Sequence, residues 1–173
     1  GMRVPGIFWW PGAIPGGQVS DELVTTMDLL PTVAGLVRSD LPNDRVIDGK
    51  DVWPLLSGKP GARTPHSHFF YTIWPGTIDA VRVGDWKLNV QHPHRHQATE
   101  PGNDRKRAGE VTERIGLSLF NLKSDLFETT NVADKHPDIV KSMLKLIEAG
   151  RRDMGDAREK IKGWNVRPPG RID

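Results

Sequence analysis

The chain has 173 residues, of which 36% are hydrophobic and 27% charged, and its formal net charge is +2. This composition is that of a globular protein with one ordinary domain or two small ones, and it excludes a chain that is disordered throughout. The small charge excludes the clustered basic surface of a nucleic-acid-binding protein, and the apolar runs are too short to span a bilayer. Neither nucleic acid nor a membrane is therefore expected as a partner.

The first predicted element is a short buried strand over Val4–Trp10, which is mostly apolar and ends at the Pro11-Gly12 turn. A helix is expected to follow, because Ser20 offers an N-cap and apolar residues then recur at helical spacing, interrupted by Pro31. The apolar stripe of this predicted helix consists of Leu23, Met27, Leu30, Val33, Ala34 and Val37.

The segment Pro42–Pro65 is rich in Pro, Gly and Asp, which predicts a connector. Three apolar segments after it are predicted to contain strands, namely His68–Trp74, Ala80–Val90 and Leu117–Leu122. The second of these is expected to fold back on itself at Gly84-Asp85. Pro137 then opens an amphipathic helix, whose stripe is Ile139, Val140, Met143, Leu144 and Ile147. The pattern predicts an α+β fold in which a small antiparallel sheet packs against a C-terminal helix.

Polar residues cluster at three further places. Lys and Arg concentrate at Arg105–Arg107 and over Arg151–Lys162, where acidic residues are interleaved, and both segments are expected to be solvated surface. Asp125, Glu128 and Asn131 follow a predicted strand, where their side chains are expected to satisfy backbone groups of a turn and a helix start.

The run His92-Pro93-His94-Arg95-His96 places an imidazole at every second position. In an extended loop these rings could face one side and hold a zinc or copper ion. The chain has no cysteine, and no fourth ligand accompanies the three histidines. An exposed loop is therefore the preferred interpretation, and no metal ligand is assigned.

The run His66-Ser67-His68 suggests a nucleophile beside a base. Adjacent residues of a strand point to opposite faces, however, and the sequence has no G-x-S-x-G nucleophile turn. No catalytic residue is assigned within this chain.

Five blocks occur in a defined order along the chain. They are R-V-P-G-I-F-W-W-P-G (Arg3–Gly12), M-D-L-L-P-T (Met27–Thr32), I-D-G-K-D-V-W-P-L-L-S-G (Ile47–Gly58), A-V-R-V-G-D-W-K-L (Ala80–Leu88) and L-F-N-L-K-S-D-L-F-E-T-T-N-V-A-D-K-H-P-D-I-V (Leu119–Val140). In these blocks the chain resembles the back part of an arylsulfatase-like member of the sulfatase family. The resemblance implies that residues 1–60 are a strand-helix remnant of the alkaline-phosphatase-like α/β domain plus a connector. Residues 61–173 would be the C-terminal subdomain.

The resemblance also implies a chemistry. Sulfatases hydrolyse sulfate esters with a formylglycine made from the Cys or Ser of a C/S-x-P/A-x-R motif, and they bind calcium through an Asp-Asp and an Asp-Asn pair. This chain has no cysteine, no serine in such a motif and neither dipeptide. The expectation is a C-terminal fragment that is inactive alone and holds no cofactor, with calcium and formylglycine belonging to the complete enzyme.

By the same resemblance, the strand end at residues 66–68 and the segment after A-V-R-V-G-D-W-K-L are expected near the substrate entrance of the complete enzyme. The residues expected beside substrate are His66, His68, His92, His94 and His96.

The expected partners are a catalytic half located upstream and a second copy of the chain, bound through the strand and helix predicted between residues 4 and 37. The alternative function is a non-catalytic binding module that recognises sulfated carbohydrate through Arg, Lys and His. The first residues carry no signal-peptide pattern, so the compartment is left open, although a periplasmic or secreted location is expected for the parent enzyme. The substrate is not predicted.

Overall fold

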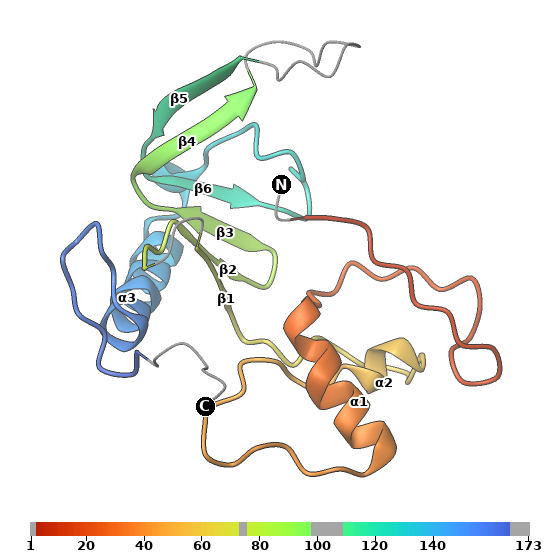
Figure 1. The fold of residues 1–173 in the computed structure, drawn as a ribbon. Helices are drawn as coiled ribbons and strands as arrows, with labels where there is room; N and C mark the ends of the chain where they lie inside the picture. The colour runs from red at the N-terminus through yellow and green to blue at the C-terminus, as the bar shows by residue number, and fades with distance from the viewer. Residues whose placement is uncertain (1–2, 73–75, 98–108, 167–173) are drawn as a thin grey trace. The chain divides into compact units, whose positions relative to one another are not determined.

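A computed structural model describes residues 3–72, 76–97 and 109–166 (Figure 1). The chain divides into two compact units, residues 1–67 and residues 68–173. The first unit contains the 3-10 helix η1 (Thr26–Asp28) and the helices α1 (Leu29–Val37) and α2 (Trp53–Leu56). The second contains β1 (Phe69–Tyr71), β2 (Ala80–Val83), β3 (Trp86–Asn89), β4 (His92–Gln97), β5 (Glu110–Ile115), β6 (Ser118–Asn121), the 3-10 helix η2 (Ala133–Lys135) and α3 (Pro137–Met154).

The helix of the first unit begins later than the sequence predicts. Ser20, the expected N-cap, accepts a hydrogen bond from the N–H of Glu22 at 3.2 Å, and no helix starts there. The helical segment starts after Thr25, whose N–H donates to the carboxylate of Asp28 at 2.7 Å. An acid three residues after the N-cap closes a first helical turn in this way. The helix itself is confirmed, but Asp28 sets its beginning.

The strand predicted over Val4–Trp10 is wrong. These residues form no regular element, and their side chains are exposed, with Ile7 at 91% and Trp9 at 83%. Pro5 lacks a backbone N–H, and in the described part of the chain no neighbouring strand pairs with this segment. A strand needs such a partner for its backbone groups, so an apolar sequence alone did not produce one.

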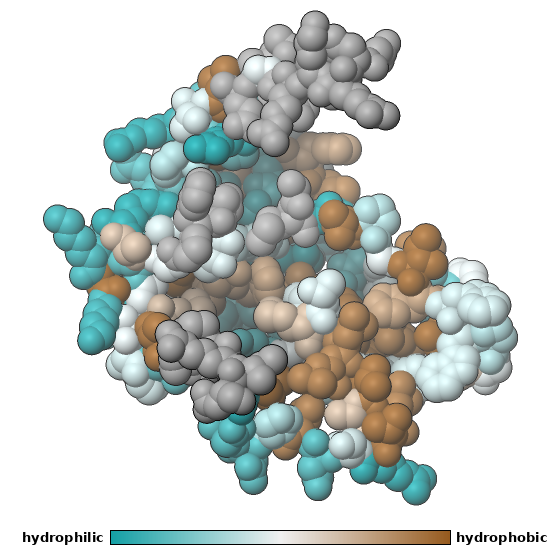
Figure 2. All heavy atoms as spheres, viewed as in Figure 1, coloured by the Kyte–Doolittle hydropathy of each residue, from teal (hydrophilic) through white to brown (hydrophobic). Residues whose placement is uncertain are grey.

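The helix α1 is apolar on several sides, since its sequence L-L-P-T-V-A-G-L-V contains no charged residue. Pro31, Thr32 and Ala34 are buried. The remaining large apolar side chains are 37% to 66% exposed; we call them the apolar face of α1, and they are Leu29, Leu30, Val33, Leu36 and Val37. Figure 2 shows apolar atoms gathered over α1.

The second unit is built on a four-stranded antiparallel sheet in the order β1-β2-β3-β6. The hairpin predicted within Ala80–Val90 is confirmed as β2 and β3, which meet at Gly84-Asp85, where Gly84 has a φ of 55°. The strand predicted within Leu117–Leu122 is confirmed as β6. Strand β1 occupies part of the predicted segment His68–Trp74, and residues 73 and 74 of that segment lie outside the described residues.

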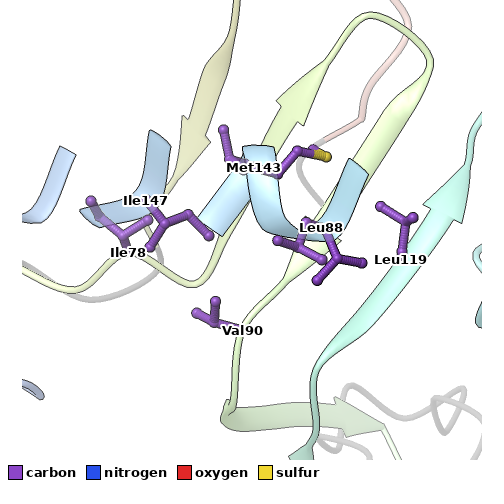
Figure 3. Close-up of a cluster of buried hydrophobic side chains, with 8 residues drawn as sticks. Ile78, Leu88, Val90, Leu119, Met143 and Ile147 are labelled. Carbon is purple, nitrogen blue, oxygen red and sulfur yellow. The ribbon is translucent and has the colours of Figure 1, made fainter. Parts of the chain in front are cut away.

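Helix α3 covers one face of this sheet, as the sequence predicts. Val140, Met143 and Ile147 are buried against residues of β2, β3 and β6, among them Leu88 and Leu119 (Figure 3). Each fully buried side chain of this size stabilises the fold by roughly 1.5–3 kcal/mol. The packing is tight near the end of the helix, because a Cβ on Gly150 would lie 2.7 Å from the ring of Phe70. A side chain at position 150 would therefore have to displace the ring of Phe70.

The exposed loop expected at His92–His96 is wrong. These residues belong to β4, which forms a two-stranded antiparallel sheet with β5, pairing His92 with Ile115 and His96 with Val111. The β-branched and charged residues of β5 supply a partner strand that the sequence of β4 alone does not reveal.

The predicted α+β class is confirmed for the described residues, which combine small antiparallel sheets with a C-terminal helix. None of the helices described is long and apolar enough to cross a bilayer.

Candidate functional site

The most buried titratable pair of the first unit joins His66 to Asp28. The His66 Nε2 atom lies 2.8 Å from Oδ1 of Asp28, and the two side chains are 7% and 0% exposed. The same carboxylate accepts hydrogen bonds from the N–H groups of Thr25, at 2.7 Å, and Lys50, at 2.8 Å. Asp28 thus holds the start of the helical segment, the residues before α2 and the end of the unit together. This geometry gives His66 a structural contact inside the unit.

His68 begins the second unit, and its ring packs edge-on against Phe70 with ring centres 4.9 Å apart. The neighbouring Ser67 is exposed. The two histidines that flank Ser67 therefore belong to different units, although they are two residues apart in the chain.

The three histidines of β4 occupy alternate positions and so share one face of the strand. His92 is 5% exposed, and its Nδ1 atom lies 2.7 Å from the carbonyl oxygen of Val90. The rings of His94 and His96 stack with centres 5.8 Å apart and planes inclined by 19°. Strand β4 therefore brings His94 and His96 together and gives His92 a separate backbone contact. A role of these residues beside substrate stays a prediction.

A charged cluster lies on the face of the four-stranded sheet opposite α3. Lys87 donates to both carboxylate oxygens of Glu128, at 2.6 and 2.8 Å, and its Nζ atom lies 5.0 Å from the ring centre of Tyr71. Burial raises the pKa of the Tyr71 phenol, while the charge and hydrogen bond of Arg82 act in the opposite direction. Glu128 has a φ of 56°, a left-handed conformation that is uncommon for a residue with a side chain. In this backbone conformation both carboxylate oxygens of Glu128 accept hydrogen bonds from Lys87.

Two of the three residues expected to satisfy a turn and a helix start do so. Asp125 accepts hydrogen bonds from the N–H groups of Thr129 and Thr130, at 3.0 and 2.8 Å, and these bonds lower the pKa of its carboxyl group. Asn131 accepts from the N–H groups of Leu119 and Ala133, at 2.9 and 3.0 Å. The predicted roles of Asp125 and Asn131 are confirmed, whereas Glu128 forms the ion pair with Lys87 instead.

A buried ionic network at the end of α3 was not expected from the sequence. Asp156 is 1% exposed and accepts from Arg151 Nε at 3.0 Å. It also accepts from the backbone N–H groups of Ile78, Arg158 and Glu159, at 3.2, 3.0 and 3.2 Å.

Arg158 extends this network, because its guanidinium donates to the carboxylate of Asp79 at 2.5 Å and to the carbonyl of Gln91 at 3.3 Å. The expectation of solvated surface over Arg151–Lys162 is wrong for these residues, since they fasten the segment after α3 to the approach to β2. The one sequence signal is Gly155, a glycine at a helix end that commonly opens a structured turn. The other basic segment, Arg105–Arg107, lies outside the described residues.

Neither formylglycine nor calcium fits the residues present. The sequence has no cysteine and no serine in the motif that is converted to formylglycine. Among the residues that the structure describes, no group of three or more His, Cys, Asp or Glu side chains is placed to hold a metal ion. No reaction step can be assigned to either group on this chain.

Comparison with known proteins identifies the region. The family model described as the C-terminal region of aryl-sulfatase matches residues 64–169. Arylsulfatase A from Bos taurus is 33% identical over 152 residues, which are 86% of this chain and 29% of that protein. Arylsulfatase D from Homo sapiens is 51% identical over 71 residues, which are 41% of this chain and 12% of that protein.

A solved structure shows the same fold. The PsFucS1 sulfatase from Pseudoalteromonas sp. superposes with a TM-score of 0.65 over 82% of this chain and 28% of that chain, at 22% sequence identity. The chain thus spans less than a third of the length of the relatives it matches.

Proposed function

Since this chain belongs to the sulfatase family, whose C-terminal region it carries, we propose that it serves as the C-terminal part of a sulfuric ester hydrolase. The observation that carries the proposal is the family match over residues 64–169, which includes the whole second unit except its last residues. The turn after β6 agrees with such a role, because Asp125 and Asn131 of the family-like block hold its backbone.

We propose further that the chemistry requires residues from outside this chain. Hydrolysis of a sulfate ester in this family needs an aldehyde-derived nucleophile and a divalent cation, and neither fits the residues present. The chain alone is therefore expected to show no turnover of an aryl sulfate. Its contribution would be to complete the fold of a catalytic part and to shape the approach to its active site.

The apolar face of α1 offers a surface for such an association. Its five side chains are 37% to 66% exposed. Burying an apolar area of this kind under a partner is favourable, because it removes apolar surface from water. We propose that a sulfatase catalytic part covers this face. In the absence of that part, a second copy of the chain is expected to do so.

The alternative function, a module that binds sulfated carbohydrate without catalysis, has less support. Sulfate recognition needs cationic side chains that are free to meet the anion. Three cations of the second unit are instead paired with carboxylates, Lys87 with Glu128, Arg151 with Asp156 and Arg158 with Asp79. These pairs favour a structural role for the cations.

The test is an assay with a chromogenic aryl sulfate and added calcium. It compares the chain alone, a separately expressed sulfatase catalytic part alone, and a mixture of the two. The proposal expects turnover in the mixture that exceeds the sum of the separate rates. Turnover by the isolated chain would contradict the proposal, because it would require a nucleophile within these 173 residues.

A binding experiment separates the two functions. If the mixture shows no gain in turnover and the chain alone binds a sulfated oligosaccharide in calorimetry but not its desulfated counterpart, the binding module is the correct function. If the chain binds neither sugar and the mixture is active, the role in a hydrolase is supported.

A further inference from the structure

Strand β4 holds two imidazole rings side by side, an arrangement that the sequence alone could not establish. His94 and His96 are separated by one residue on a strand, and their rings stack at 5.8 Å with nearly parallel planes. Pairing with β5 over six residue pairs fixes the backbone beneath both side chains. The two rings therefore share one face of a small sheet at a spacing set by that ladder.

The surroundings of the pair suit a cation. His94 lies opposite Glu113 on β5, and directly paired residues of an antiparallel ladder project to the same face. Glu113 therefore lies on the same face of the ladder as the two imidazoles. Arg95, which lies between the histidines in sequence, projects to the other face of the strand. His92 shares the histidine face, but it is buried and in contact with the Val90 carbonyl.

We propose that His94 and His96 form a two-histidine chelate for a divalent transition-metal ion of the Cu²⁺, Ni²⁺ or Zn²⁺ type. Imidazole nitrogen suits these ions, and their bonds to it are roughly 2.0–2.1 Å long for zinc. Both rings are only partly buried, so rotation about their side-chain torsions can turn one nitrogen of each toward a shared ion.

The site is an open one. Within the described ranges no third His, Cys, Asp or Glu side chain, Glu113 included, is placed to form a three-ligand group with the pair, so water would complete the coordination. The general order of affinities for divalent first-row metals then predicts Cu²⁺ as the tightest ligand, ahead of Ni²⁺ and Zn²⁺. This inference does not depend on the proposed function, because it concerns metal binding by the chain without substrate.

The experiment titrates the full chain with Cu²⁺ by isothermal calorimetry and records the electron paramagnetic resonance spectrum of the complex. The parent chain is expected to bind one ion with nitrogen hyperfine structure. His94→Ala and His96→Ala are each expected to weaken binding at least about tenfold, because each leaves one ligand where two were linked.

Two control variants separate chelation from general effects. Arg95→Gln changes the same strand on its other face, and His68→Gln removes a histidine outside β4; both are expected to bind within about twofold of the parent. Circular dichroism checks that every variant is folded. The proposal is overturned if the parent binds no Cu²⁺, or if either His94→Ala or His96→Ala binds within twofold of the parent.

Discussion

His66 Nε2 lies 2.8 Å from Oδ1 of Asp28, although the two residues are 38 positions apart in the sequence. The carboxylate is fully buried, and it also accepts two backbone N–H groups from separate segments. The Asp28 side chain thus connects three segments of the first unit, at Thr25, Lys50 and His66. The consequence for His66 is that its ring is engaged in the fold of the unit.

Replacing Asp28 should therefore destabilise the first unit. Asp28→Ala removes the acceptor for Thr25, Lys50 and His66, and leaving buried donors unsatisfied costs about 1–3 kcal/mol each. We expect a loss of about 3 kcal/mol in the free energy of unfolding, measured by urea denaturation. Asp21→Ala is the matched control, because the Asp21 side chain is 91% exposed. Equal unfolding midpoints for the two variants would contradict the structural role of Asp28.

Replacing Asp156 should likewise destabilise the second unit. Asp156→Ala leaves the Arg151 guanidinium and three backbone N–H groups without their acceptor, and breaking a buried ion pair costs about 3–5 kcal/mol. Thermal unfolding should show a fall in Tm of more than about 8 °C. Glu148→Ala, an exposed acid on α3, should change Tm by only a degree or two. A similar Tm for both variants would mean that the network adds no net stability.

Asp125 links stability to acidic pH. Hydrogen bonds from Thr129 and Thr130 lower the pKa of its carboxyl group in the folded chain. A folded pKa below the unfolded value means that the stabilisation is present above the unfolded pKa, about 3.9, and is lost as pH falls through the folded pKa. Asp125→Asn should therefore be less stable than the parent at pH 7, and the difference should shrink below about pH 4. Urea midpoints at pH 7, 5 and 3 test this; a difference independent of pH would contradict it.

Tyr71 gives a prediction at alkaline pH, and it is the only tyrosine in the chain. Burial raises the pKa of its phenol, so the ultraviolet absorbance of tyrosinate should appear above the ordinary value of about 10. A raised folded pKa stabilises the fold below the unfolded pKa, and this contribution is lost as pH rises through the folded pKa. Arg82 lowers the pKa, so Arg82→Met should move the absorbance midpoint to still higher pH. An unchanged midpoint in this variant would show that Arg82 does not act on Tyr71.

The apolar face of α1 predicts association. Leu30 and Val33 are 56% and 53% exposed, and we expect the isolated chain to form dimers whose population rises with concentration. The double variant Leu30→Glu and Val33→Glu should be monomeric in light scattering, because charged side chains resist burial in an apolar interface. Glu148→Ala on the second unit serves as the control and should associate as the parent does. A monomeric parent at all concentrations would contradict the expectation.

Much of the second unit was predictable from the sequence because its elements rest on local patterns. Helix α3 follows from a stripe that includes Met143 and Ile147 at helical spacing, and the β2–β3 hairpin follows from alternating apolar residues around Gly84. Asp125 and Asn131 act on backbone groups close in sequence, which is why their roles could also be predicted.

The candidate sites were harder to predict, because several of their contacts join residues far apart in the chain. Periodicity, turn residues and motif order are local properties, and they were enough to predict the α+β class, the position of α3 and the resemblance to sulfatases. The folded structure was needed to show that His66 contacts Asp28, that Asp156 is buried and paired with Arg151, and that β5 makes the segment of His94 and His96 a strand. It also decided that Val4–Trp10 is no strand. The His66 contact, strand β4 and the contact of Asp156 with Ile78 each depend on a group far away in the chain, and the residues beside a polar atom in sequence do not specify such a partner.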